Sequence, residues 1–281
     1  MYLFDCGEGT QRQMMKFAVG FTVREIFVTH LHADHYLGLA GLLRTLSLQG
    51  RTEELVIWGP GDEHGTLESA ATVGGDRFSF PLQVRELPAE SAIRYDGYEI
   101  RCFETDHAPG SFGLALVEDV RPGRFDVERA RALGVPEGPQ FGRLHRGENV
   151  RLADGRVITP DALVGPPRRG RKLVYTSDTR PCDSVLRAAG GADLLIHECT
   201  FSDEEAERAA ETRHSTARQA ASAAARANAK RLILTHFSAR HSEQAHRLVK
   251  EARAVFPVVE AAEDGMTVEV PLPDEDGATA A

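Results

Sequence analysis

The chain has 281 residues, a formal net charge of -9 at pH 7 and four cysteines without C-x-x-C spacing, which excludes a disulfide scaffold and a uniformly basic surface. Its length suits one large core, so we expect a single domain over residues 1–281 with insertions, and the cysteines as buried free thiols. No run of about 18 apolar residues and no signal peptide is present, which favours a soluble, cytoplasmic protein.

Short apolar runs that end in polar residues predict six strands, at 25–30, 54–59, 98–107, 172–178, 194–200 and 231–237. Helical spacing occurs between them. A leucine stripe over 39–46 predicts a helix that ends near Gly50, and the alanine-rich stretch 215–228 predicts another helix with Ser215 as its cap. A last helix is expected over 244–256. Strands and helices in alternation predict an α/β layered fold.

The segment 119–171 is rich in Gly, Pro and Arg and contains only short patterned pieces, such as a helix expected at 127–133. Between Arg121 and Lys172 there are 12 Lys and Arg against 6 Asp and Glu, net +6, while the rest of the chain carries -15. Such a basic island is what contact with a polyanion requires, although a solvated loop with ordinary arginines is an alternative. We therefore expect an inserted basic arm at 119–171, and a disordered acidic tail at 273–281.

The strongest local signal is THLHADH, which places His30, His32, Asp34 and His35 between a predicted strand and the leucine-striped helix. Imidazole and carboxylate are the ligand types that zinc and similar divalent metals prefer, and a tight strand-to-helix turn can direct alternate side chains to one point. A lone histidine at a strand end is usually structural. Three histidines and an aspartate so close together would each need a separate hydrogen-bond partner, so the motif predicts a metal site.

Three more residues of the same types follow other predicted strands: His107, Asp178 and His236. If the sheet brings these strand ends together, seven ligands converge, which suits two metals bridged by one carboxylate. His197 is expected to pack inside the fold. The other histidines considered lie in polar or helical surface contexts and are not expected to bind metal: His64, His145, His241 and His246.

The pattern HxHxDH followed by a distant His, Asp and His resembles the metallo-β-lactamase superfamily, whose fold is an αββα sandwich with metals at one edge of two sheets. Within that superfamily, further segments resemble ribonuclease Z, the endonuclease family that removes 3′ trailers from precursor tRNA: FDCGEGTQRQ, THLHADH, DHAPGSFG, GVPEGPQFGRL, GPPRRGRKLVYTSDTR, HECTF, HSTA and LTHFSAR. They span nearly the whole chain in the same order. The family normally begins with another strand pair before FDCGEGT, so the resemblance also implies that N-terminal strands are missing here.

This resemblance implies two zinc ions, with manganese as the alternative metal. It assigns the ligands to two groups that share one bridging carboxylate: His30, His32 and His107; Asp34, His35 and His236; and Asp178 between them. Asp5 would support a ligand from behind the site. Asp34 would accept the proton of the attacking water, and His214, held by Glu198, would protonate the leaving 3′ oxygen. The products would be a tRNA 3′-hydroxyl and a trailer with a 5′-phosphate.

The resemblance also makes the arm at 119–171 an exosite that grips precursor tRNA by shape and phosphate contacts across a homodimer. Four basic residues at its end are the expected RNA contacts: Arg168, Arg169, Arg171 and Lys172. No DNA or membrane partner is expected. Two alternatives stay open. One is a general metallo-phosphodiesterase or arylsulfatase-like hydrolase acting on small esters, which needs no arm; the other is a truncated, non-catalytic member that binds RNA.

Overall fold

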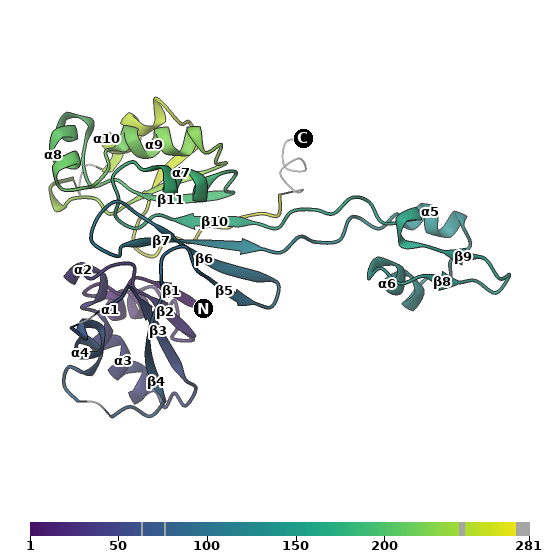
Figure 1. Cartoon of the computed structure of the whole chain (residues 1–281), viewed down its shortest axis with the longest axis horizontal. Coiled ribbons are helices and arrows are strands. Elements are labelled where there is room, and N and C mark those ends of the chain that lie inside the picture. The colour runs from purple at the N-terminus through teal and green to yellow at the C-terminus, as the bar shows by residue number, and fades with distance from the viewer. Residues whose placement is uncertain (63, 76, 242–244, 274–281) are drawn as a thin grey trace. The chain divides into compact units, whose positions relative to one another are not determined.

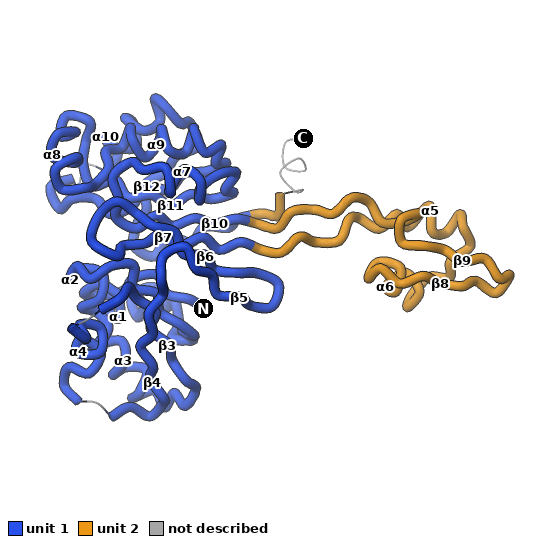
Figure 2. The backbone as a smooth tube through the Cα atoms, in the orientation of Figure 1, with its two compact units in different colours: residues 1–117, 172–270 blue, residues 118–171, 271–281 orange. Residues whose placement is uncertain are grey.

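The computed structural model describes residues 1–62, 64–75, 77–241 and 245–273. The chain separates into two compact units, one of residues 1–117 with 172–270 and one of residues 118–171 with 271–281 (Figure 2). Almost all of the tail expected at 273–281 lies outside the described residues, as does Gln244, the expected start of the last helix. No helix in the described ranges is long and apolar enough to cross a membrane.

Two sheets form the larger unit. Their strands are β1 (Tyr2–Phe4), β2 (Glu25–Phe27), β3 (Leu55–Gly59), β4 (Leu82–Glu86), β5 (Ala92–Tyr95), β6 (Tyr98–Glu104), β7 (Phe112–Glu118), β10 (Lys172–Tyr175), β11 (Leu194–Glu198), β12 (Leu232–Thr235) and β13 (Val259–Ala261). The helices are α1 (Thr10–Lys16), α2 (Ala33–Tyr36), α3 (Leu39–Leu48), α4 (Thr66–Thr72), α7 (Asp183–Ala189), α8 (Ala206–Glu211), α9 (Ala217–Arg226) and α10 (Ala245–Arg253), with 3-10 turns η2 (Asp203–Glu205) and η3 (Ala239–His241).

The strand order places many carboxyl ends of strands along the same edges. One sheet has four parallel strands in the order β1-β2-β3-β4. The other has the order β13-β12-β11-β10-β7-β6-β5, in which β10 to β13 are parallel and β7 runs antiparallel to β10. Parallel strands deliver the residues that follow them to one edge of the sheet, which is where such folds bind ligands.

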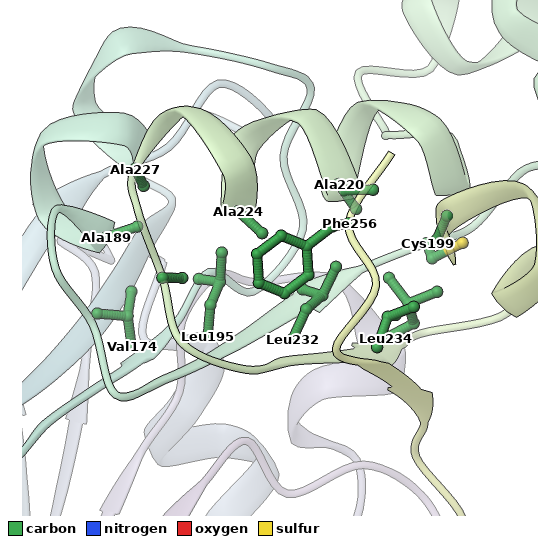
Figure 3. Packing of buried hydrophobic residues seen from close by; sticks show 14 of the residues in the cluster. Val174, Ala189, Leu195, Cys199, Ala220, Ala224, Ala227, Leu232, Leu234 and Phe256 are labelled. Atoms are coloured by element: carbon green, nitrogen blue, oxygen red, sulfur yellow. The ribbon is translucent and has the colours of Figure 1, made fainter. Parts of the chain in front are cut away.

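Three apolar layers hold the two sheets and their helices together. Phe27 of β2 packs with Ile100, Phe112 and Leu114 from β6 and β7 between the sheets. The leucine stripe of α3 packs on the outer face of the first sheet. On the outer face of the second, Figure 3 shows the alanines of α9 lying over Leu195 of β11 and strand β12. Figure 1 shows the resulting order of layers: helices, sheet, sheet, helices.

The structure confirms the six predicted strands and the helix over the leucine stripe, with shorter bounds. The predicted cap of the alanine-rich helix is wrong. Thr216 caps α9, because its side chain accepts a hydrogen bond from the backbone N of Gln219, whose own side chain bonds back to Thr216. The hydroxyl of Ser215 instead donates to the carbonyl of Thr179 at 2.7 Å.

The smaller unit has a hydrophobic core of its own. It contains α5 (Val127–Ala132), α6 (Pro139–His145), β8 (Val150–Arg151), β9 (Val157–Ile158) and the 3-10 turn η1 (Pro160–Ala162). Ala130, Leu144, Val150, Ile158 and Leu163 are buried together. Asp126 caps α5 by accepting a hydrogen bond from the backbone N of Arg129. The segment therefore folds on more than the short pieces that its sequence pattern indicates.

Candidate metal centre

Three strands end at non-glycine residues with left-handed backbone: Asp5 after β1 (φ 59°), Ser177 after β10 (φ 56°) and His236 after β12 (φ 57°). This conformation costs an L-residue about 1 kcal/mol or more, so it persists only where surrounding contacts impose it. A candidate site residue stands at each turn or directly after it, as Asp178 does after Ser177. The strained turns therefore mark where the strands deliver their polar residues.

Two glycines explain how the FDCGEGT loop lies against the HxHxDH turn. A Cβ at Gly7 would collide with the backbone carbonyl of Asp34, and one at Gly38 would collide with the backbone of Cys6 and Gly7. The backbone N of Cys6 donates to the carbonyl of His35 at 2.8 Å, and that of Gly38 donates to the carbonyl of Cys6 at 2.8 Å. The loop after β1 and the turn after β2 thus touch backbone to backbone.

The seven predicted metal ligands lie in one cluster. Five groups of three donor residues lie within 4.8 Å of one another in the described residues, and two of them are the predicted ones: His30, His32 and His107, and Asp34, His35 and His236. The other three groups combine these histidines with Asp178, His214 or Glu198. Asp178 Oδ2 lies close to both groups, at 3.7, 3.3, 3.8 and 3.2 Å from the Nε2 atoms of His30, His35, His107 and His236. Ligands about 2.1 Å from a tetrahedral metal are about 3.4 Å apart, so these separations suit shared cations.

Unpartnered buried atoms give an independent test of whether the cluster fits metal ions. His30 Nε2, His35 Nε2 and Asp178 Oδ1 are buried and make no hydrogen bond with the described residues. Burial lowers the pKa of His30 to about 3, so its ring is neutral, as a ligand must be. Burial alone would raise the pKa of Asp178, but the neighbouring histidines, His35 first, hold it below its usual value and keep the carboxylate ionised. The residues therefore fit divalent cations.

Asp5 joins residues from both sheets directly beneath the cluster. Its carboxylate lies 2.9 Å from His35 Nδ1 and accepts hydrogen bonds from the backbone N of Thr29 (2.8 Å) and the hydroxyl of Tyr175 (2.8 Å). Thr29 Oγ1 also lies 2.6 Å from Ser177 Oγ and 3.2 Å from His30 Nδ1. Because Asp5 contacts Nδ1 of His35, the Nε2 atom of that ring is left for the cluster.

Glu198 and His214 form a separate pair at the edge of the cluster. Glu198 is fully buried, and its Oε1 lies 2.8 Å from His214 Nδ1. The backbone N of Thr179 donates to the same oxygen at 3.1 Å, and Thr200 donates to Oε2 from both its backbone and its hydroxyl. The ring of His214 stacks 5.4 Å from that of His236. The pair thus holds an imidazole, 14% exposed, beside the metal ligands.

The four basic residues expected to contact RNA are not among the groups that could hold a metal ion in the described residues. Arg168, Arg169 and Arg171 belong to the smaller unit, and Lys172 begins β10. Arg171 pairs with Glu118, and Lys172 Nζ donates to the carbonyl of Gly190 at 2.9 Å.

Three of the remaining histidines bond residues outside the cluster. His197 is buried and bonds the carbonyl of Glu198 through Nδ1, while His145 and His241 bond Gly123 and Glu205. All four cysteines are free thiols, but only three are buried, because Cys182 is partly exposed.

Several residues that support the ligands were not singled out from the sequence. Thr29 and Ser177 each stand directly before a predicted ligand, and Tyr175 stands three residues before Asp178, so proximity to the motifs was the available signal. Thr200, two residues after Glu198, also lies 2.9 Å from His236 Nδ1. Threonine, serine and tyrosine are common residues, so their presence alone does not indicate a role. Their contacts with the ligands form only when the strands pair, and the local sequence does not reveal that pairing.

Comparison with known proteins agrees with this geometry. A model described as "Metallo-beta-lactamase superfamily" matches residues 2–83, and one described as "Beta-lactamase superfamily domain" matches residues 143–237. Among solved structures, the metallo-beta-lactamase fold protein YhfI from Bacillus subtilis is 19% identical, with a TM-score of 0.66 over 95% of this chain and 87% of its own, which shows the fold alone. The protein is thus a metallo-β-lactamase-fold protein with a histidine-rich metal site.

Closer relatives define the family within that class. Ribonuclease Z from Gemmatimonas aurantiaca is 54% identical over 97% of this chain and 88% of its own length, and ribonuclease Z from Haloferax volcanii is 53% identical over 98% and 87%. The structure of human tRNase Z, short form, is 28% identical with a TM-score of 0.64, covering 96% of this chain and 88% of the human one. The chain belongs to the ribonuclease Z family.

Proposed function

We propose that this protein is the endoribonuclease that removes the 3′ trailer from precursor tRNA. One observation carries the proposal: seven histidine and aspartate side chains of metal-binding type and a buried Glu198–His214 pair, drawn from the strand ends of both sheets, converge in a ribonuclease Z family member. The cut leaves a 3′-hydroxyl on the tRNA and a 5′-phosphate on the trailer.

The proposed metal centre holds two zinc ions. One ion would be held by His30, His32 and His107 and the other by Asp34, His35 and His236, with the Asp178 carboxylate close to both groups. When bound, such ions lower the pKa of a water and neutralise the scissile phosphate. Support comes from the two donor groups and from the short distances of Asp178 to both. The ligand set also accepts manganese.

The chain's own side chains move the protons in this mechanism. Asp34, whose carboxylate is 67% exposed and whose pKa is lowered chiefly by His236, is ionised and can accept a proton from the attacking water. His214 donates a proton to the leaving 3′ oxygen. Glu198 contacts Nδ1 of His214, which fixes the orientation of the ring and leaves Nε2 to face the substrate. Asp5 keeps His35 in its ligand orientation.

The smaller unit, residues 118–171, is proposed to be the tRNA-binding arm, acting within a homodimer. The net charge of residues 118–171, +3 from 11 Arg against 8 Asp and Glu, supports this, and their own core supports their acting as a folded module. Several of its arginines already pair with acidic residues of the same unit, such as Arg131 with Glu137 and Arg143 with Glu148. We therefore propose that RNA contact is shared among many side chains, with Arg168, Arg169, Arg171 and Lys172 as the first to test.

The test is cleavage of a 3′-extended tRNA by the purified protein. We expect a single cut at the trailer junction, loss of cutting in a chelator, and recovery when zinc is added back. End-group analysis should find the 3′-hydroxyl on the tRNA. A protein that hydrolyses small phosphodiesters but not this RNA would be a general hydrolase, and one that binds the RNA without metal or cleavage would be a non-catalytic member; either result contradicts the proposal.

A further inference from the structure

A polar cavity of about 390 Å³ shares His107 with the metal cluster. The loop 104–111 forms most of its wall, and Arg213 closes it on the side of the segment that leads to His214. Both His107 and His214 belong to the proposed active site, so the cavity lies directly beside the chemistry. The mechanism described above does not use it.

Arg213 is tied to His107 in both directions. Its carbonyl lies 3.0 Å from His107 Nδ1, and its Nη1 donates to the carbonyl of His107 at 3.0 Å. Its backbone is left-handed, with φ 58°. Arg213 is therefore held in a strained conformation by contacts with a metal-ligand residue, which indicates a position that the site requires.

A second arginine lies close to the first through a shared aspartate. Arg180 Nε donates to Asp106 Oδ2 at 2.7 Å, and Arg213 Nη1 lies 3.9 Å from Asp106 Oδ1. The two positively charged guanidinium groups thus share a single negatively charged carboxylate, which leaves a net positive charge. Nη1 and Nη2 of Arg180, and Nε and Nη2 of Arg213, make no hydrogen bond with the described residues, and the two side chains are 43% and 54% exposed. These donors are available to an anion in solution.

We infer that Arg213 and Arg180 bind the RNA phosphate that neighbours the scissile one on the tRNA side. This inference rests on the proposed function. In the proposed mechanism, His214 protonates the leaving 3′ oxygen of the tRNA. Because Arg213 directly precedes His214, we place Arg213 beside the nucleotide that carries this oxygen. Guanidinium groups suit the recognition of phosphate because their planar donors can pair with two of its oxygens. Glu104, which is exposed and lines the same cavity, repels a phosphate, so the phosphate should bind at the end of the cavity that Arg213 lines.

Holding this phosphate would position the leaving oxygen for protonation. Arg213→Ala should therefore raise KM for precursor tRNA about tenfold, equivalent to about 1.4 kcal/mol of binding. Arg180→Ala should act in the same direction, and Arg213→Lys should recover part of the loss because it keeps the charge. Arg208→Ala is the matched control, since Arg208 is an exposed arginine of the neighbouring helix α8 and packs over Phe201.

The experiment combines these variants with an RNA in which one linkage is neutral. A methylphosphonate replaces the phosphate next to the cleavage site on the tRNA side, and a second RNA carries it two linkages further into the tRNA. We expect the wild-type protein to cleave the first RNA with a KM about tenfold higher than that for the unmodified RNA. Arg213→Ala should raise the KM for this RNA little further, because the charge that the arginine contacts is already absent. Zinc per chain, measured for each variant, separates loss of metal from loss of RNA contact.

Each result decides the inference. If the effects of Arg213→Ala and of the adjacent neutral linkage on KM multiply, the two changes act independently and the inference is wrong. It is also wrong if Arg213→Ala loses zinc and Arg213→Lys does not restore activity, because Arg213 then has a structural role. Equal sensitivity to both neutral linkages would also overturn it. A wild-type protein that does not cut the unmodified RNA would contradict the proposed function itself, and the inference with it.

Discussion

Under the proposed function, Glu198 and His214 hold and transfer a proton, although their donor atoms also lie within 4.8 Å of those of His236. His214→Ala should lower kcat for precursor tRNA by about 10²- to 10⁴-fold, the usual contribution of a positioned acid. Zinc content should stay unchanged, because the other donor residues remain. Metal analysis together with single-turnover cleavage checks this, and loss of zinc in the variant would assign His214 to the metal site instead.

Tyr175 tests whether the bonds beneath the cluster control metal affinity. Burial raises the pKa of its hydroxyl well above the usual value, so the group stays protonated and donates to Asp5. Tyr175→Phe removes this donor and should weaken zinc binding about tenfold, at the low end of the effect of such supporting contacts. Competition with a chromophoric chelator measures the change.

Tyr98→Phe is the matched control for that measurement, because its hydroxyl bonds the hydroxyl of Tyr2 and no cluster residue. Equal zinc affinity in wild-type protein and Tyr175→Phe would mean that Asp5 holds His35 without help from the tyrosine.

Among the larger elements, Glu118 and Arg171, at the two ends of the segment 118–171, form an ion pair. Arg171 donates to Glu118 from its backbone N (2.9 Å) and from Nε (3.0 Å), and the hydrogen bond from this arginine lowers the pKa of Glu118. A carboxylate with a lowered folded pKa stabilises the fold above its unfolded pKa of about 4.3, and this contribution is lost as the pH falls through the folded value.

Glu118→Gln should therefore destabilise the metal-free protein by about 0.5 to 1 kcal/mol at pH 7, a modest value because the pair is partly exposed. The difference from wild type should shrink as the pH falls below about 4. Urea unfolding at several pH values measures it. Glu148→Gln, at a more exposed pair, should leave the midpoint unchanged. A difference for Glu118→Gln that grows towards low pH would refute this role of the Glu118–Arg171 pair.

At the scale of the whole molecule, the two units have separate cores, so one should survive without the other. Replacing residues 121–170 with a short glycine-rich linker should leave the larger unit folded and able to bind zinc and to hydrolyse a small chromogenic phosphodiester. Cleavage of precursor tRNA should be lost, because the basic segment is gone. Parallel assays of both substrates check this, and equal loss of the two activities would favour a purely structural role for residues 118–171.

Much of this protein could be predicted from its sequence, because the informative residues are local. The HxHxDH motif follows one predicted strand, and His107, Asp178 and His236 each follow another, so the metal site depended only on the strand ends meeting. The fold class followed from the alternation of strands and helices, and the family from motifs along nearly the whole chain. Cap choice was harder: Ser215 and Thr216 are both good caps, and only the bond from Ser215 to Thr179 excludes the first.

Residue spacing and charge are properties of the chain, so they alone predict the ligand types, the α/β class and the position of the basic segment. Three features became visible only in the folded protein: which hydroxyls support the ligands, the core that residues 118–171 bury, and the sharing of Asp106 by Arg213 and Arg180 beside His107. These features depend on contacts between residues far apart in the chain, and such contacts exist only after the strands have paired and the sheets have packed.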